Sequence, residues 1–161
     1  MLPAATTVGW SDDWMWGLAL IALSVVTHAA GLALIGVGLA RVVGSMIETP
    51  SHAHRRLVLF SVASVLLAML HGVEASYWAA AYVWLGAATD FRRAIYFSLQ
   101  MVTTLGADVV LVEDRWKLMG PLEAISGMLL FGLSTAFLLA VMQRVWPFPR
   151  VMQARHPADP R

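Results

Sequence analysis

Three ionisable side chains interrupt long apolar stretches of the sequence: His28, His71 and Glu74. His71 and Glu74 are three residues apart, so on a helix they share one face. Ionisable groups are costly to bury at the centre of an apolar helix, and we expect each of them to have a partner. Three interpretations fit: a hydrogen-bonded brace between helices, a transition-metal or proton site made of two imidazoles and a carboxylate, and a pH-sensitive switch.

A second group of residues has the composition of an ion-binding turn. A short apolar and aromatic stretch, Phe91 to Val102, is followed by the run Thr103-Thr104-Leu105-Gly106-Ala107-Asp108. At about 1.5 Å per residue, the short stretch reaches roughly half the thickness of a bilayer as a helix. A half-length helix and a glycine-containing turn predict a re-entrant loop, whose carbonyl oxygens replace the hydration shell of a cation. We expect a cation to bind there.

The composition indicates that these groups lie in a membrane protein. Of the 161 residues, 59% are hydrophobic and 13% are charged, whereas a soluble domain carries about 25% charged residues. That charge is too scarce to cover the surface of a soluble enzyme, and a net charge of +1 does not favour nucleic-acid binding. The absence of cysteine excludes disulfides and thiolate metal sites. We therefore expect a membrane protein that is not an enzyme and has no nucleic-acid partner.

Three further apolar stretches are long enough to cross a bilayer as helices. They run over residues 14–40, 57–87 and 118–146, with Glu123 near the start of the last one. With the short helix over residues 91–102, they predict a single all-α membrane domain over residues 1–161. The loop between the first two stretches and the proline-containing tail, residues 147–161, both carry an excess of arginine. Because basic loops favour the cytoplasm, we expect a cell-membrane protein with its amino terminus outside and its carboxyl terminus inside.

The order of these elements resembles the potassium-channel superfamily, including bacterial and two-pore-domain channels. The resemblance rests on Tyr96-Phe97-Ser98, on Thr103-Thr104-Leu105-Gly106 with Asp108 after it, and on Phe131-Gly132-Leu133-Ser134-Thr135-Ala136. It implies an outer helix over 57–87, a pore helix over 91–102, a selectivity filter over 103–108, an inner helix over 118–146 and an extra first span. Because one such loop supplies a quarter of a fourfold filter, the resemblance also implies a homotetramer embedded in lipid.

Two glycines of the last stretch, Gly127 and Gly132, correspond by the same resemblance to a gate hinge. Small residues also allow membrane helices to approach closely. Both interpretations, hinge and close packing, remain open for these two residues.

The predicted filter departs from the family pattern. A potassium filter reads T-V-G-Y-G-D, whereas this chain reads Thr104-Leu105-Gly106-Ala107-Asp108, one residue shorter and without the aromatic residue and the second glycine. The resemblance therefore implies a weakly selective or non-selective cation channel. The alternatives are a non-conducting channel-like scaffold or accessory protein, and a membrane protein with a metal or proton site at His28, His71 and Glu74.

Overall fold

The computed structural model describes residues 5–44, 53–106 and 116–145, and all the regular structure in this part of the chain is helical. The elements are α1 (Ala5–Gly44), α2 (Ala53–Trp84), α3 (Phe91–Val102) and α4 (Met119–Val145). Within these described residues, three segments are long and apolar enough to cross a membrane: Trp10–Val42, His54–Trp84 and Met119–Val145. The chain thus has the all-α membrane architecture that the sequence predicts.

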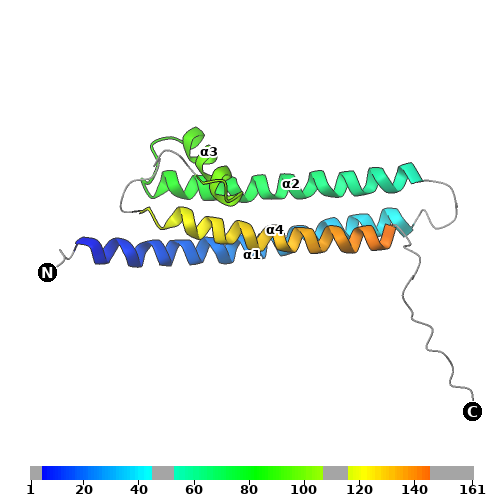
Figure 1. Ribbon diagram of the computed structural model, residues 1–161, viewed down its shortest axis with the longest axis horizontal. Helices are drawn as coiled ribbons and strands as arrows, with labels where there is room; N and C mark the ends of the chain where they lie inside the picture. Colours follow the sequence, from blue (N-terminus) through cyan, green and yellow to red (C-terminus); the bar gives the residue numbers. More distant parts are fainter. Residues whose placement is uncertain (1–4, 45–52, 107–115, 146–161) are drawn as a thin grey trace, which may run out of the picture.

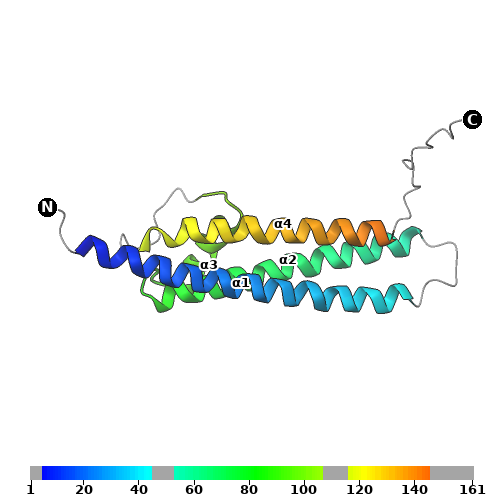
Figure 2. The same ribbon diagram turned by 90° about the horizontal axis from the view of Figure 1, so that it is seen from below.

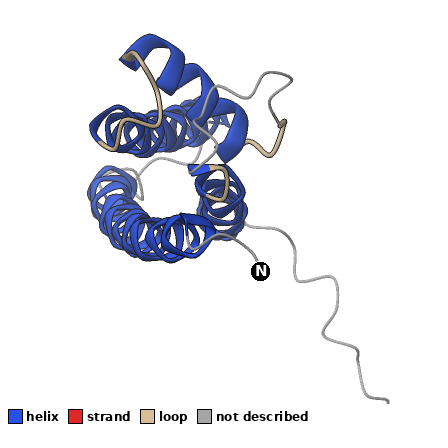
Figure 3. Ribbon diagram, turned by 90° about the vertical axis from the view of Figure 1, so that its left-hand side faces the viewer, coloured by secondary structure: helices blue, strands red, loops and turns tan. Residues whose placement is uncertain are grey.

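The three long helices pack against one another in pairs. α1 and α4 run in the same direction along the bundle, and α2 runs antiparallel to both (Figures 1 and 2). Viewed from the end that carries α3, the long helices form a triangle and α3 lies outside it (Figure 3). α3 contacts α2 and α4, at the end of the bundle where α2 ends and α4 begins (Figure 1).

The helix ends differ from the boundaries predicted from hydropathy. The predicted spans cover residues 14–40, 57–87 and 118–146, whereas the helices run over Ala5–Gly44, Ala53–Trp84 and Met119–Val145. α1 extends past its predicted span in both directions, because charged residues such as Asp12 and Arg41 continue a helix even though they end an apolar run.

α2 ends three residues before the predicted position because Gly86 terminates it. Gly86 has a φ of +69°, a left-handed conformation that glycine adopts without steric cost. Its N–H donates to the carbonyl of Val83 (3.1 Å), and the N–H of Ala87 donates to the carbonyl of Tyr82 (2.8 Å). This pair of bonds is the Schellman motif, which satisfies the last carbonyls of a helix and turns the chain away from its axis.

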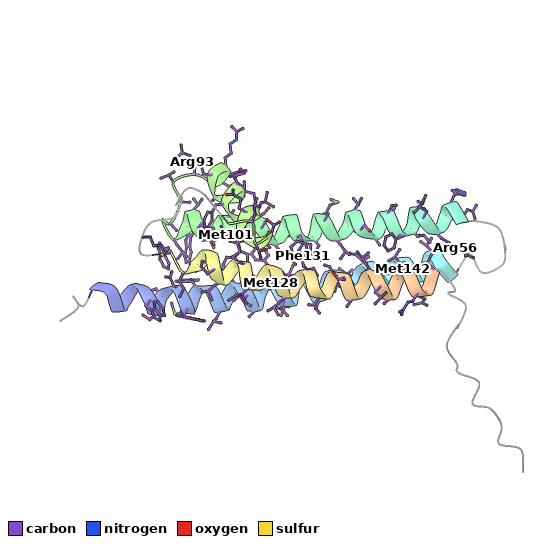
Figure 4. The ribbon with its side chains drawn as sticks, viewed as in Figure 1. Arg56, Arg93, Met101, Met128, Phe131 and Met142 are labelled. Carbon is purple, nitrogen blue, oxygen red and sulfur yellow. The ribbon has the colours of Figure 1, made fainter. Side chains whose placement is uncertain are left out.

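Asp90 caps the start of α3, since its carboxylate accepts a hydrogen bond from the backbone N–H of Arg93 (2.9 Å). One face of α3 is buried against α2 and α4, and it consists of Ala94, Phe97, Ser98, Met101 and Val102. Arg93 projects away from the bundle, at the end of the molecule opposite to Arg56 (Figure 4). The main hydrophobic core lies at this end, where Trp78, Tyr82 and Phe97 pack together with Met119 and Leu122.

Candidate functional site

α3 runs along the outside of α2 and α4 toward the middle of the bundle rather than lying across its end (Figure 3). The Ser98 hydroxyl lies 2.9 Å from the backbone carbonyl oxygen of Ala75, nine residues before the end of α2 at Trp84. The backbone of Val102 lies against Gly127, eight residues into α4. At about 1.5 Å per residue, the last turns of α3 lie about 12–14 Å inside the ends of both membrane-spanning helices.

The chain then turns sharply at Thr104. Thr104 has a φ of +58°, its N–H donates to the carbonyl of Met101 (2.8 Å), and the N–H of Leu105 donates to the carbonyl of Gln100 (2.9 Å). This is the same Schellman motif that ends α2, with threonine in the position that Gly86 holds there. The hydroxyl of Thr103 donates back to the carbonyl of Leu99 (2.6 Å).

The residues of the predicted filter that the structure describes are exposed on the single chain. Thr103, Thr104, Leu105 and Gly106 are all exposed, Leu105 to 77%, and Gly106 also has a positive φ of +78°. The other two predicted filter residues, Ala107 and Asp108, lie outside the described residues. The turn at the end of α3 is thus a surface feature of one chain, located well inside the ends of its neighbouring helices.

The two glycines predicted as hinge residues have different surroundings. A Cβ at Gly127 would collide with the backbone carbonyl of Val102, whereas a Cβ at Gly132 would meet no atom within 4 Å. Gly127 therefore allows the end of α3 to approach α4, which is the packing interpretation. Gly132 has no such contact with the described part of the chain, and its role as a hinge stays a prediction.

A buried carboxyl group joins α2, α3 and α4. Glu123 is fully buried, and its Oε2 accepts a hydrogen bond from the hydroxyl of Tyr82 (2.7 Å). Its Oε1 accepts one from the hydroxyl of Ser98, which also lies against the carbonyl of Ala75. Glu123 thus attaches the middle of the short helix to both of the long helices beside it.

The three ionisable residues singled out in the sequence come together in one cluster. Nδ1 of His28 lies 2.8 Å from Oε1 of Glu74, and Nδ1 of His71 lies 3.1 Å from Oε2 of the same carboxylate. On the far side of both rings, the Ser134 hydroxyl lies 3.0 Å from Nε2 of His28 and 3.1 Å from Nε2 of His71. The cluster joins α1, α2 and α4, and Phe131 stacks on the ring of His71 at a centroid distance of 4.3 Å.

Sequence reasoning located part of these sites. The proximity of His28, His71 and Glu74 follows from their equal depth in adjacent antiparallel helices. In the sequence, Ser134 stands in the glycine-containing motif of the last span and Glu123 near the start of that span, although a polar residue inside an apolar span is itself a signal. The partners of Glu123 had no signal in the sequence, because they depend on which helix faces meet.

A comparison with protein families identifies the family to which this chain belongs. Residues 57–144, more than half of the chain, match the family described as "Ion channel", which is of the two-transmembrane potassium-channel type. The chain therefore belongs to this potassium-channel-like family of ion channels. The match covers α2, α3 and α4 and leaves α1 outside. No curated protein matched in a separate search, and no solved structure matched either.

Proposed function

We propose that the protein is a weakly selective or non-selective cation channel, in which four copies of the chain surround one pore. Each copy contributes residues Thr103 to Asp108 to a shared filter for monovalent cations, K⁺ or Na⁺. The role is one of transport in the cell membrane, with no catalytic residues. The end of the bundle that carries α3 faces outward, and the carboxyl terminus lies in the cytoplasm.

One observation supports this proposal above the others: the exposed turn at the end of α3. Irregular backbone at membrane depth is tolerated where protein buries it or where it lines water. Thr103, Thr104 and Gly106 are exposed on the single chain. They follow Val102, whose backbone lies against Gly127, about 12 Å inside the end of α4. Neighbouring copies and a water-filled axis would together provide the surroundings that these residues need.

The end of α3 also favours cations over anions. A helix carries about half a negative charge at its carboxyl end, and this end of α3 is next to the exposed turn. The terminal carbonyls of Gln100 and Met101 already accept hydrogen bonds from the Schellman turn. These carbonyls therefore contribute a negative electrostatic potential at the filter and do not coordinate the ion directly.

Weak selectivity follows from the short sequence of the filter. The run Thr104-Leu105-Gly106-Ala107 before Asp108 is one residue shorter than the potassium filter T-V-G-Y-G-D and lacks its aromatic residue and second glycine. Discrimination between K⁺ and Na⁺ depends on several successive rings of carbonyl oxygens. A filter with fewer rings supports permeation with little discrimination.

Flux measurements on the purified protein in liposomes test this proposal. We expect K⁺ and Na⁺ to permeate at similar rates, and we expect Gly106→Val to abolish both fluxes, because valine is strained at a φ of +78°. Gly38→Val is the matched control, since a Cβ at Gly38 meets no atom within 4 Å. Strong selectivity for K⁺ contradicts the short-filter argument, and a fourfold particle without flux favours the non-conducting scaffold.

A further inference from the structure

We propose that His28, His71 and Glu74 bind one divalent transition-metal ion of the Zn²⁺ type within the membrane domain, with Ser134 orienting both imidazole rings. The site is separate from the filter, and the proposal does not depend on ion conduction. His28 lies on α1, outside the segment that matches the ion-channel family. The site therefore includes one ligand from outside the part of the chain that matches the family.

The donor atoms already have nearly the spacing of a metal site. Nδ1 of His28 and Nδ1 of His71 lie 2.8 and 3.1 Å from the two oxygens of Glu74, and one ligand atom from each residue lies within 4.8 Å of the others. Two ligands of a tetrahedral zinc ion, each bonded at about 2.0–2.1 Å, are about 3.3 Å apart. Small side-chain movements are enough to place all three around one ion.

The contact between His71 and Glu74 distinguishes a metal site from a simple brace. Although their atoms are 3.1 Å apart, Nδ1 of His71 and Oε2 of Glu74 are both buried without a hydrogen-bond partner. The two atoms are therefore close without the alignment that a hydrogen bond requires. A metal ion between them would accept an electron pair from each and satisfy both.

Ser134 holds the rings in the orientation that such a site needs. When the Nδ1 atoms of both histidines bind the ion, each Nε2 carries a proton and must donate it elsewhere. The hydroxyl oxygen of Ser134 lies 3.0 and 3.1 Å from the two Nε2 atoms and has two lone pairs to accept both protons. Hydrogen-bond partners of this kind, which do not bind the metal themselves, set the ring orientation of metal-binding histidines.

Charge and ligand type select the class of ion. Two imidazole nitrogens favour Zn²⁺ and similar transition metals over Mg²⁺ or Ca²⁺, which prefer oxygen ligands. Glu74, whose side chain is 1% exposed, neutralises one of the two charges inside the apolar span. A hydroxide or another anion at the fourth position would neutralise the second.

Co²⁺, which has a visible spectrum in tetrahedral sites, is the probe for this site. The full-length protein in detergent is stripped of metal, titrated with Co²⁺ and then with Zn²⁺. We expect one Co²⁺ per chain with a tetrahedral absorption band that Zn²⁺ removes. His71→Ala and Glu74→Gln should abolish the band, whereas His54→Ala, a change at an exposed histidine of the same helix, should retain it.

Ser134→Ala keeps the test decisive if removal of a ligand unfolds the chain. It leaves all three ligands in place, and loss of such a hydrogen-bond partner weakens metal binding by about 10–100-fold. Wild-type affinity in Ser134→Ala, an absence of Co²⁺ binding to the wild type, or a band that survives both His71→Ala and Glu74→Gln would overturn the proposal.

Discussion

Glu123 is a buried acid whose hydrogen bonds restrict what can replace it. Its two oxygens accept bonds from the hydroxyls of Tyr82 and Ser98, and the same Ser98 hydroxyl lies 2.9 Å from the carbonyl of Ala75. That hydroxyl has one proton for two acceptors. A side chain that both accepts from Tyr82 and donates to Ser98 would therefore keep both hydroxyls and the carbonyl of Ala75 paired.

Glutamine is such a side chain, so we expect Glu123→Gln to unfold at nearly the wild-type temperature. Glu123→Ala leaves buried polar groups without partners, at a cost of about 1–3 kcal/mol each. Thermal unfolding in detergent, followed by tryptophan fluorescence, measures both variants. Equal destabilisation by the two substitutions would mean that the negative charge, rather than the hydrogen bonds, holds α3 in place.

Gly127 and Gly132 differ in the space that a side chain would have, so alanine should affect stability differently at the two positions. A Cβ at Gly127 meets the backbone of Val102, which cannot move aside as a flexible side chain can. We expect Gly127→Ala to destabilise the fold by about 1–3 kcal/mol, the usual cost of overpacking. Gly132→Ala should be neutral or stabilising by up to about 1 kcal/mol, because alanine is the better helix former. The same unfolding assay separates them, and a loss of stability in Gly132→Ala would reveal a contact outside the single chain.

At the scale of elements, the sequence was sufficient for the helices but not for their contacts. Hydropathy and length depend on local composition, and they predicted three spans and a short helix between the last two. The helix ends were less accurate, since the end of α2 depends on the conformation of Gly86 rather than on polarity. The role of Ser134 could not be predicted, because it bonds to histidines 106 and 63 residues away in the chain.

The two Schellman turns allow a matched test of how α2 and α3 end. Gly86 and Thr104 hold the same left-handed position, at φ values of +69° and +58°, but a branched side chain is strained there by about 1–2 kcal/mol. We expect Gly86→Ala to lower stability and Thr104→Gly to raise it by about 1 kcal/mol. Strain of this kind persists at functional sites, so Thr104→Gly should also reduce cation flux. Unchanged flux in a stabilised variant would argue against a role for Thr104 in the pore.

At the scale of the whole molecule, the proposed orientation makes the two ends of the bundle distinguishable. The sequence contains no cysteine, so each single-cysteine variant carries one reactive thiol. Thr89 is exposed in the turn before α3, and His54 is exposed near the start of α2. In intact cells, a membrane-impermeant maleimide should label Thr89→Cys. It should label His54→Cys only after the cells are permeabilised. The reverse pattern would place α3 on the cytoplasmic side.

The arrangement of α3 also predicts how the copies assemble. Its inner face packs on α2 and α4, while Tyr96 and Leu99 on the other side are 62% and 44% exposed. These apolar side chains lie beside the exposed turn at Thr103 and Thr104. A neighbouring copy that covered them would bring the turns of the four chains around a common axis, which is what a shared filter requires.

Truncating this face should therefore weaken the assembly without unfolding the chain. We expect the purified protein to be a particle of four chains by native mass spectrometry, and we expect the double variant Tyr96→Ala and Leu99→Ala to dissociate at higher protein concentration. The matched control is the pair Leu23→Ala and Leu34→Ala, which removes exposed apolar side chains from α1 and should leave four chains together. A monomeric or dimeric wild-type protein would contradict the shared pore, since a single turn supplies a quarter of its lining.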